Sequence, residues 1–121
     1  NGYEVQDLGT HSEERCDYPD FGAAVGRAVS AGQADRGVAV CGSGIGICMA
    51  VNKIPGARGA VIRDEYDAEY SRLHNDANVA CFGGRLTAAA HAQELLQLWL
   101  NTAFEGGRHE GRVEKLDHLT D

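Results

Sequence analysis

Apolar residues recur at helical spacing in several stretches of the chain, and turn residues mark where some of these stretches stop. The clearest case begins near Pro19, which suits a first helical turn, and stops at Gly32, which favours a helix end. The apolar positions between them are Phe21, Ala24, Val25, Ala28 and Val29. Together with the turn residues, the pattern predicts helices over residues 19–32, 45–52, 66–73, 86–104 and 108–119.

Short apolar runs separate these helical stretches and predict strands. They cover residues 3–8, 37–41, 59–62 and 79–82. Strands that alternate with helices predict an α/β fold, here a three-layer, doubly wound parallel sheet of the Rossmann-like type. In such a sheet the ligand lies beyond the carboxyl ends of the strands, so the residues that follow each strand are the functional candidates.

Length, charge and cysteine content narrow the class of protein. A chain of 121 residues fits one domain, residues 1–121. The net charge of -7 disfavours a nucleic-acid partner and repels anions, so arginines must dominate the local field if the substrate is a phosphate. No apolar stretch or leader indicates a membrane partner or export, so we expect a cytoplasmic protein with free thiols. No C-x-x-C pair is present, and no metal is expected.

The loop that follows the strand at residues 37–41 carries the sharpest chemical signal. It reads Cys41, Gly42, Ser43, Gly44, Ile45 and Gly46, and a helix is expected to begin within it. Glycines allow a tight turn, and a helix start adds unpaired N–H groups and partial positive charge. The loop therefore predicts a site for a phosphate or a reaction oxyanion, although a plain strand-to-helix turn is the alternative. Neither the dinucleotide-binding loop nor the P-loop pattern is met.

Cys41 ends the strand, which places its thiol at the expected ligand edge beside a helix start. Such surroundings lower a thiol pKa from about 8.5 toward neutrality. A thiolate there can accept a carbon-bound proton or attack a carbonyl, and the alternative is a small buried residue at a strand end. That structural role is the one we expect for Cys16, Cys48 and Cys81.

His74, Asn75 and Asp76 lie between an expected helix and the strand after it. The histidine either caps the helix C-terminus or moves protons near neutral pH. Asn75 and Asp76 are common turn residues, so their presence alone does not indicate a site.

Three arginines are candidates for binding an anion. Arg85 follows a strand through two glycines, at the expected ligand edge. Arg108 and Arg112 stand four residues apart near a helix start, where they repel each other and oppose the helix dipole. A bound phosphate would neutralise that arrangement, whereas the alternative is a solvated pair relieved by neighbouring glutamates.

Taken together, these motifs resemble the type B ribose-5-phosphate isomerases, a family that includes galactose- and allose-phosphate isomerases. The matching segments run in order through nearly the whole chain: Asp17 to Pro19, Cys41 to Gly46, Asn52 to Lys53, Ser71 to Asn78, Phe82 to Arg85 and Phe104 to Arg112. The resemblance implies an enzyme that interconverts ribose 5-phosphate and ribulose 5-phosphate without a cofactor. An isomerase of a hexose 6-phosphate and a non-catalytic sugar-phosphate binding protein are the alternatives.

The resemblance also implies roles for individual residues. Cys41 matches the base that removes the proton beside the carbonyl, and Ser43 matches the proton relay between the substrate oxygens. The backbone of Gly42 to Gly46 matches the hole for the enediolate. His74 matches the acid/base that opens the sugar ring. The substrate-binding matches are Asn75, Arg85, Arg108 and Arg112, the last two on the phosphate.

Assembly is a further implication of the resemblance. The family forms homodimers or homotetramers with shared active sites, and its C-terminal helix extends toward a partner subunit. The match to this chain begins at the family's second strand, so the family's first strand, its Asp-His pair and its first helix have no counterpart in residues 1–121. A cysteine hydrolase or transferase, in which Cys41 attacks a carbonyl and His74 is its base, is the rival enzyme hypothesis.

Overall fold

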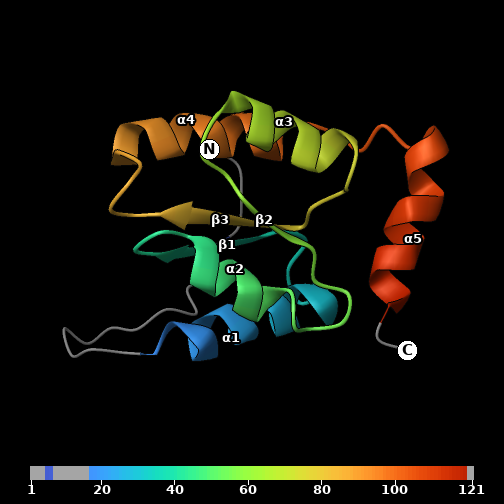
Figure 1. Cartoon of the computed structure of the whole chain (residues 1–121), viewed down its shortest axis with the longest axis horizontal. Coiled ribbons are helices and arrows are strands. Elements are labelled where there is room, and N and C mark those ends of the chain that lie inside the picture. Colours follow the sequence, from blue (N-terminus) through green and yellow to red (C-terminus); the bar gives the residue numbers. More distant parts are fainter. Residues whose placement is uncertain (1–4, 7–16, 120–121) are drawn as a thin grey trace.

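The computed structural model describes residues 5–6 and 17–119. Its elements, in chain order, are α1 (Tyr18–Ser30), β1 (Gly37–Cys41), α2 (Ile45–Val51), β2 (Gly59–Val61), α3 (Glu65–Leu73), β3 (Val79–Gly83), α4 (Ala89–Leu100), the 3₁₀ turn η1 (Gly107–His109) and α5 (Glu110–His118). Helices α1 and α2 cover one face of the sheet, and α3 and α4 cover the other (Figure 1). This arrangement confirms the expected three-layer α/β fold.

The described sheet has three parallel strands in the order β1-β3-β2. All five residues of the central strand β3 are buried, which explains its uniformly small or apolar sequence. Strand β1 lies at an edge of this sheet, where Gly37 and Ala39 are buried while Val38 and Val40 remain 41% and 56% exposed. The register pairs Cys41 with Gly83, so both strands end together at one edge.

Each face of the sheet has its own apolar core. Ile47, Cys48 and Val51 of α2 pack with Val79 and Cys81 on one face. On the other face, the side chains that pack together include Ile62, Phe82, Leu95 and Trp99. The burial of Cys48 and Cys81 confirms their expected structural role, whereas Cys16 lies outside the described residues.

The long helix expected over residues 86–104 was too long at both ends. Leu86 and Thr87 donate their backbone N–H groups to the Gly83 carbonyl in a turn, so α4 begins only at Ala89. At the other end Thr102 Oγ1 donates to the Leu98 carbonyl, and the chain leaves the helix. The Glu105 N–H then donates to the Leu73 carbonyl, 3.0 Å away, at the end of α3. Apolar spacing could not reveal this long-range pairing.

One other expectation differs from the structure, and another lies almost wholly outside the described residues. The helix expected over residues 108–119 starts as the turn η1 and becomes α-helical only at Glu110. The strand expected over residues 3–8 lies almost wholly outside the described residues, and the two described ones, Val5 and Gln6, belong to no strand. Among the described helices, none has the length and apolar character needed to cross a membrane.

Candidate active site

Cys41 stands at the carboxyl end of β1, at the start of the glycine loop. The Gly44 N–H donates to Cys41 Sγ at 3.2 Å, so the sulfur faces the loop. The thiol is partly exposed. The thiol therefore lies where the sequence predicts it, beside backbone amides at the carboxyl end of β1.

Glycines are needed where this loop meets the end of β3. Gly44 has a φ of 80°, in the left-handed region that side chains rarely adopt. A Cβ on Gly83 would lie 2.7 Å from the Ser43 carbonyl carbon and oxygen, so the loop and the strand approach more closely than an alanine allows. Ser43 Oγ accepts the Ile45 N–H at 3.2 Å and stabilises the start of α2. The loop is thereby held over the end of the sheet with its amides around Cys41.

The surroundings of Cys41 favour its ionised form. Burial, the largest single effect, raises the pKa of the Cys41 thiol. The backbone N–H groups of Ile47, Gly44 and Ser43, together with the Ser43 hydroxyl, stabilise the thiolate and outweigh burial. The net result is a Cys41 pKa below the ordinary thiol value.

The buried pair Cys48 and Cys81 behaves differently. The hydrogen bond between the two thiols and the burial of Cys81 raise the pKa of Cys81, which therefore keeps its proton. The same hydrogen bond lowers the pKa of Cys48, but Cys48 is only 7% exposed. Neither thiol combines ionisation with access to solvent.

Iodoacetamide should therefore alkylate Cys41 faster than Cys48 or Cys81 in the native protein. Alkylation requires an accessible thiolate, and Cys41 meets both conditions. Peptide mapping by mass spectrometry over time would give the three rates, with urea-unfolded protein as the control in which they converge. Equal alkylation rates for Cys41 and Cys81 in the native protein would contradict the assignment of Cys41 as the accessible thiolate.

An open hollow of about 500 Å³ borders the thiol. Its lining residues are Tyr18, Cys41, Gly42, Ser43, Ile45, Gly46, Arg85 and Leu86. The Arg85 side chain lies over Gly42, where an added Cβ would be 3.3 Å from Nε, and the Tyr18 ring lies over Gly46. Arg85 thus borders the thiol as expected, and sequence reasoning missed Tyr18 although the residue falls within a matched segment.

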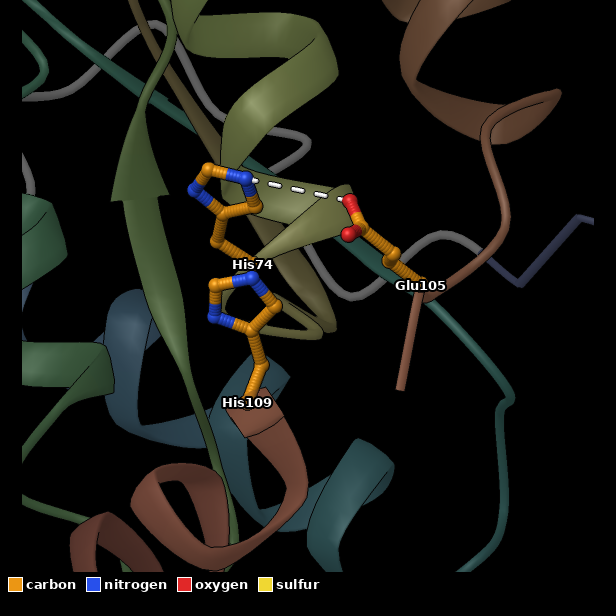
Figure 2. Close-up of side chains that lie close together, drawn as sticks. All are labelled: His74, Glu105 and His109. Atoms are coloured by element: carbon orange, nitrogen blue, oxygen red, sulfur yellow. Dashed lines mark ion pairs between the residues drawn. The ribbon is translucent and has the colours of Figure 1, made fainter. Parts of the chain in front are cut away.

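His74 belongs to a second cluster, at the C-terminal end of α3. Its ring stacks on that of His109, with centroids 4.2 Å apart and an angle of 16° between the planes. His74 Nε2 lies 3.8 Å from Glu105 Oε2. Figure 2 shows the three side chains converging from the end of α3, the segment after α4, and η1. Sequence reasoning missed Glu105 and His109, although both fall within the matched segment from Phe104 to Arg112.

The arginines beside this second cluster are exposed and carry no ion pair to any carboxylate in residues 17–119. Arg108 and Arg112 flank His109, and their charges lower the pKa of that histidine. Burial is the largest cause of this low pKa and the charge of His74 is the next, while Glu105 opposes them. The alternative to a phosphate site was a pair of arginines relieved by neighbouring glutamates, and no ion pair among residues 17–119 supports it.

Asn75 and Asp76, which follow His74, have different surroundings. Asn75 is exposed. Asp76, at a φ of 48°, accepts from Arg72 at 2.6 Å and pairs with Arg58 at 3.5 Å, so its carboxylate holds the turn between α3 and β3. Of the pair, Asn75 is the more exposed.

The two clusters lie at opposite ends of the sheet. Cys41 follows the carboxyl end of β1, whereas α3 runs back past the strands and ends before β3 begins. The five-residue strand between those ends spans about 13–16 Å at roughly 3.3 Å per residue. In Figure 1 the arrowhead of β3 and the C-terminal end of α3 point in opposite directions, with α5 at the α3 end. One chain therefore does not bring His74 to Cys41, and a hydrolase that pairs the two within one chain lacks its base.

Comparison with known proteins places this arrangement in a family. The sequence model described as Ribose/Galactose Isomerase matches residues 1–116. The chain belongs to the ribose/galactose isomerase family. Ribose-5-phosphate isomerase B of Escherichia coli is 45% identical to this isomerase over 115 residues, covering 95% of this chain and 77% of the relative. D-erythrulose-4-phosphate isomerase of Pectobacterium atrosepticum is 38% identical over 101 residues, covering 84% and 66%.

A solved structure agrees with the fold of this isomerase. Ribose-5-phosphate isomerase B of Clostridium thermocellum superposes with a TM-score of 0.94 at 48% identity, covering 98% of this chain and 80% of that one. The family resemblance read from the motifs is confirmed, and the chain is an isomerase of sugar phosphates.

Proposed function

We propose that this isomerase interconverts ribose 5-phosphate and ribulose 5-phosphate through a cis-enediolate, with residues 1–121 acting as one isomerase domain and Cys41 as the base. The observation that carries the proposal is the Cys41 thiol in its amide-lined loop, with its pKa lowered by those amides. The name of the Escherichia coli relative supports the choice of a pentose phosphate.

The chemistry needs one base and a place for negative charge. The Cys41 thiolate removes the proton on C2 of the open-chain aldose, and the electron pair moves onto the carbonyl oxygen O1. Ser43 passes a proton from O2 to O1, after which Cys41 returns its proton to C1 and the ketose forms. The backbone N–H groups between Gly42 and Gly46 stabilise the enediolate, and one well-placed donor contributes about 3–4 kcal/mol.

The second cluster prepares and holds the substrate. His74 opens the furanose ring by proton transfer, and the exposed Asn75 contacts the sugar. Arg108 and Arg112 bind the phosphate, and Arg85 binds the substrate beside the thiol. The cluster around Cys41 and the cluster around His74 lie at the two ends of the sheet in one chain. We therefore propose a homodimer, alone or paired into a homotetramer, in which each site takes Cys41 from one subunit and His74 from the other.

Helix α5 supports such an assembly. It stands beside the end of the sheet, outside the two helical layers (Figure 1). The ion pair between Arg58 Nη1 and Asp117 Oδ1, at 2.8 Å, ties it to the residue before β2. Leu116 is nevertheless 48% exposed. We propose that α5 extends toward the partner subunit and buries this side chain there.

The deciding experiment is an isomerisation assay on tetrose, pentose and hexose phosphates, run in deuterated water. Ribose 5-phosphate is expected to give the highest kcat/KM, with solvent deuterium entering C1 of the ketose and, through the reverse reaction, C2 of the aldose. The tetrose is included because the Pectobacterium atrosepticum relative is named for D-erythrulose 4-phosphate. A preference for a tetrose or hexose phosphate would overturn the choice of sugar. Tight binding of all of them without turnover would make the chain a sugar-phosphate binding protein.

A further inference from the structure

The cluster formed by His74, Glu105 and His109 contains an unsatisfied buried group. The His109 side chain is only 5% exposed, and its Nε2 has no hydrogen-bond partner. Most buried side-chain nitrogens have a partner, so an unpaired one needs an explanation. One nitrogen from each histidine and one Glu105 oxygen all lie within 4.8 Å of one another. The buried His109 ring, which carries the unpaired nitrogen, therefore belongs to a group of three side chains whose ligand atoms converge.

The backbone fixes the origins of all three side chains. The Glu105 N–H donates to the Leu73 carbonyl at 3.0 Å, which holds Glu105 beside the residue that precedes His74. Gly106 and Gly107 adopt φ values of 74° and 59°, and the His109 N–H donates to the Gly106 carbonyl at 3.1 Å. This tight turn brings the buried ring under that of His74 (Figure 2).

We propose that His74, Glu105 and His109 form a binding site for a divalent transition metal of the Zn²⁺ class. Two imidazoles and one carboxylate are a frequent zinc ligand set, with a fourth position left to water. Ligand distances of about 2.0–2.1 Å place tetrahedral donors about 3.4 Å apart, so the side chains must close by roughly 1 Å. Glu105 is 53% exposed and His74 35% exposed, so both have room to rotate toward the buried nitrogen.

The charges and ligand types of the cluster determine which cations it can bind. Arg108 and Arg112 disfavour any cation, whereas the Glu105 carboxylate attracts one. Hard cations such as Mg²⁺ bind through oxygen, and the cluster offers a single carboxylate for that purpose. Imidazole nitrogens are ligands that Zn²⁺, Co²⁺ and Ni²⁺ accept well, and the cluster offers two of them. We therefore expect selectivity for Zn²⁺, Co²⁺ or Ni²⁺ over Mg²⁺.

The effect of the metal on activity rests on the proposed function, but the binding does not. A metal-bound His74 has no free lone pair on the ligating nitrogen and cannot move a proton to or from the sugar ring. Micromolar Zn²⁺ should therefore inhibit turnover of the cyclic sugar, and EDTA should restore it. The metal would act as a reversible inhibitor.

The test is calorimetric titration of metal-free protein with ZnCl₂, repeated with CoCl₂ while the absorption spectrum is recorded. One equivalent should bind, and Co²⁺ should show no sulfur charge-transfer band. Glu105→Gln and His109→Gln should each weaken binding about tenfold or more. The matched control is His91→Gln, since His91 forms a similar exposed pair with Glu65 at 3.4 Å, and this variant should bind as the wild type does.

Several results would overturn the proposal. Binding that survives both Glu105→Gln and His109→Gln, disappears in Cys41→Ser, or is equally strong for Mg²⁺ would place the metal elsewhere. Glu105→Gln keeps the test valid if the buried His109→Gln variant does not fold. Zinc binding at the cluster in a protein that isomerises no sugar phosphate would refute the proposed function alone, and isomerisation without zinc binding would refute this inference alone.

Discussion

Replacing Cys41 with serine is expected to lower kcat for ribose 5-phosphate by a factor on the order of 10³ to 10⁴. The hydroxyl is close in size to the thiol but does not ionise near neutral pH, so the loop keeps its shape and loses its base. Steady-state kinetics would measure the loss. Calorimetry on the same variant should give a substrate Kd close to the KM of the wild type, because binding depends on the arginines and the backbone.

The control and the pH profile separate chemistry from folding. Cys48→Ala also removes a thiol, but from the core, and it should cost stability without a comparable loss of kcat. In the wild type, kcat/KM should fall as the pH drops and the thiolate is protonated. The midpoint of that fall should lie below the ordinary thiol pKa, because the loop amides lower the pKa of Cys41. If the Cys41→Ser variant retained a tenth of the wild-type activity, Cys41 would not be the base.

Mixing two inactive variants is expected to restore activity. Cys41→Ser damages one cluster and His74→Gln the other, and the two clusters lie at opposite ends of the sheet. If each site combines clusters from two subunits, a mixed dimer has one intact site and one doubly damaged site. Equal amounts refolded together should regain about a quarter of wild-type activity, since half of the dimers are mixed and each has one working site.

The controls for this experiment are the two variants refolded separately and the wild type refolded alone. The double variant carrying both changes, refolded with an equal amount of the wild type, should lower the activity of the wild-type subunits by about half, because a mixed dimer then has no intact site. If the mixture of single variants is no more active than its components, while native mass spectrometry shows mixed dimers, the shared site is wrong.

Local sequence signals predicted most of the fold because they report nearest-neighbour geometry. An apolar run that ends in glycines placed β1 and the loop after it correctly, and the spacing of Val25 and Val29 identified the side of α1 that packs against the core. The ends of α4 were mispredicted because they depend on hydrogen bonds to other segments. The Glu105 N–H pairs with Leu73 rather than continuing the helix, and helical periodicity carries no record of that partner.

In the candidate site, too, the sequence predicted what depends on neighbouring residues and missed what depends on contacts between distant segments. The sequence by itself determined the Cys41 loop, because a thiol, its amide donors and the glycines that expose them are neighbours along the chain. Only the tertiary structure decided that His74 lies at the far end of the sheet and that it meets Glu105 and His109 there. The physical reason is that a helix between parallel strands must run back antiparallel to them, so its C-terminus and the strand ends are separated by the length of the sheet.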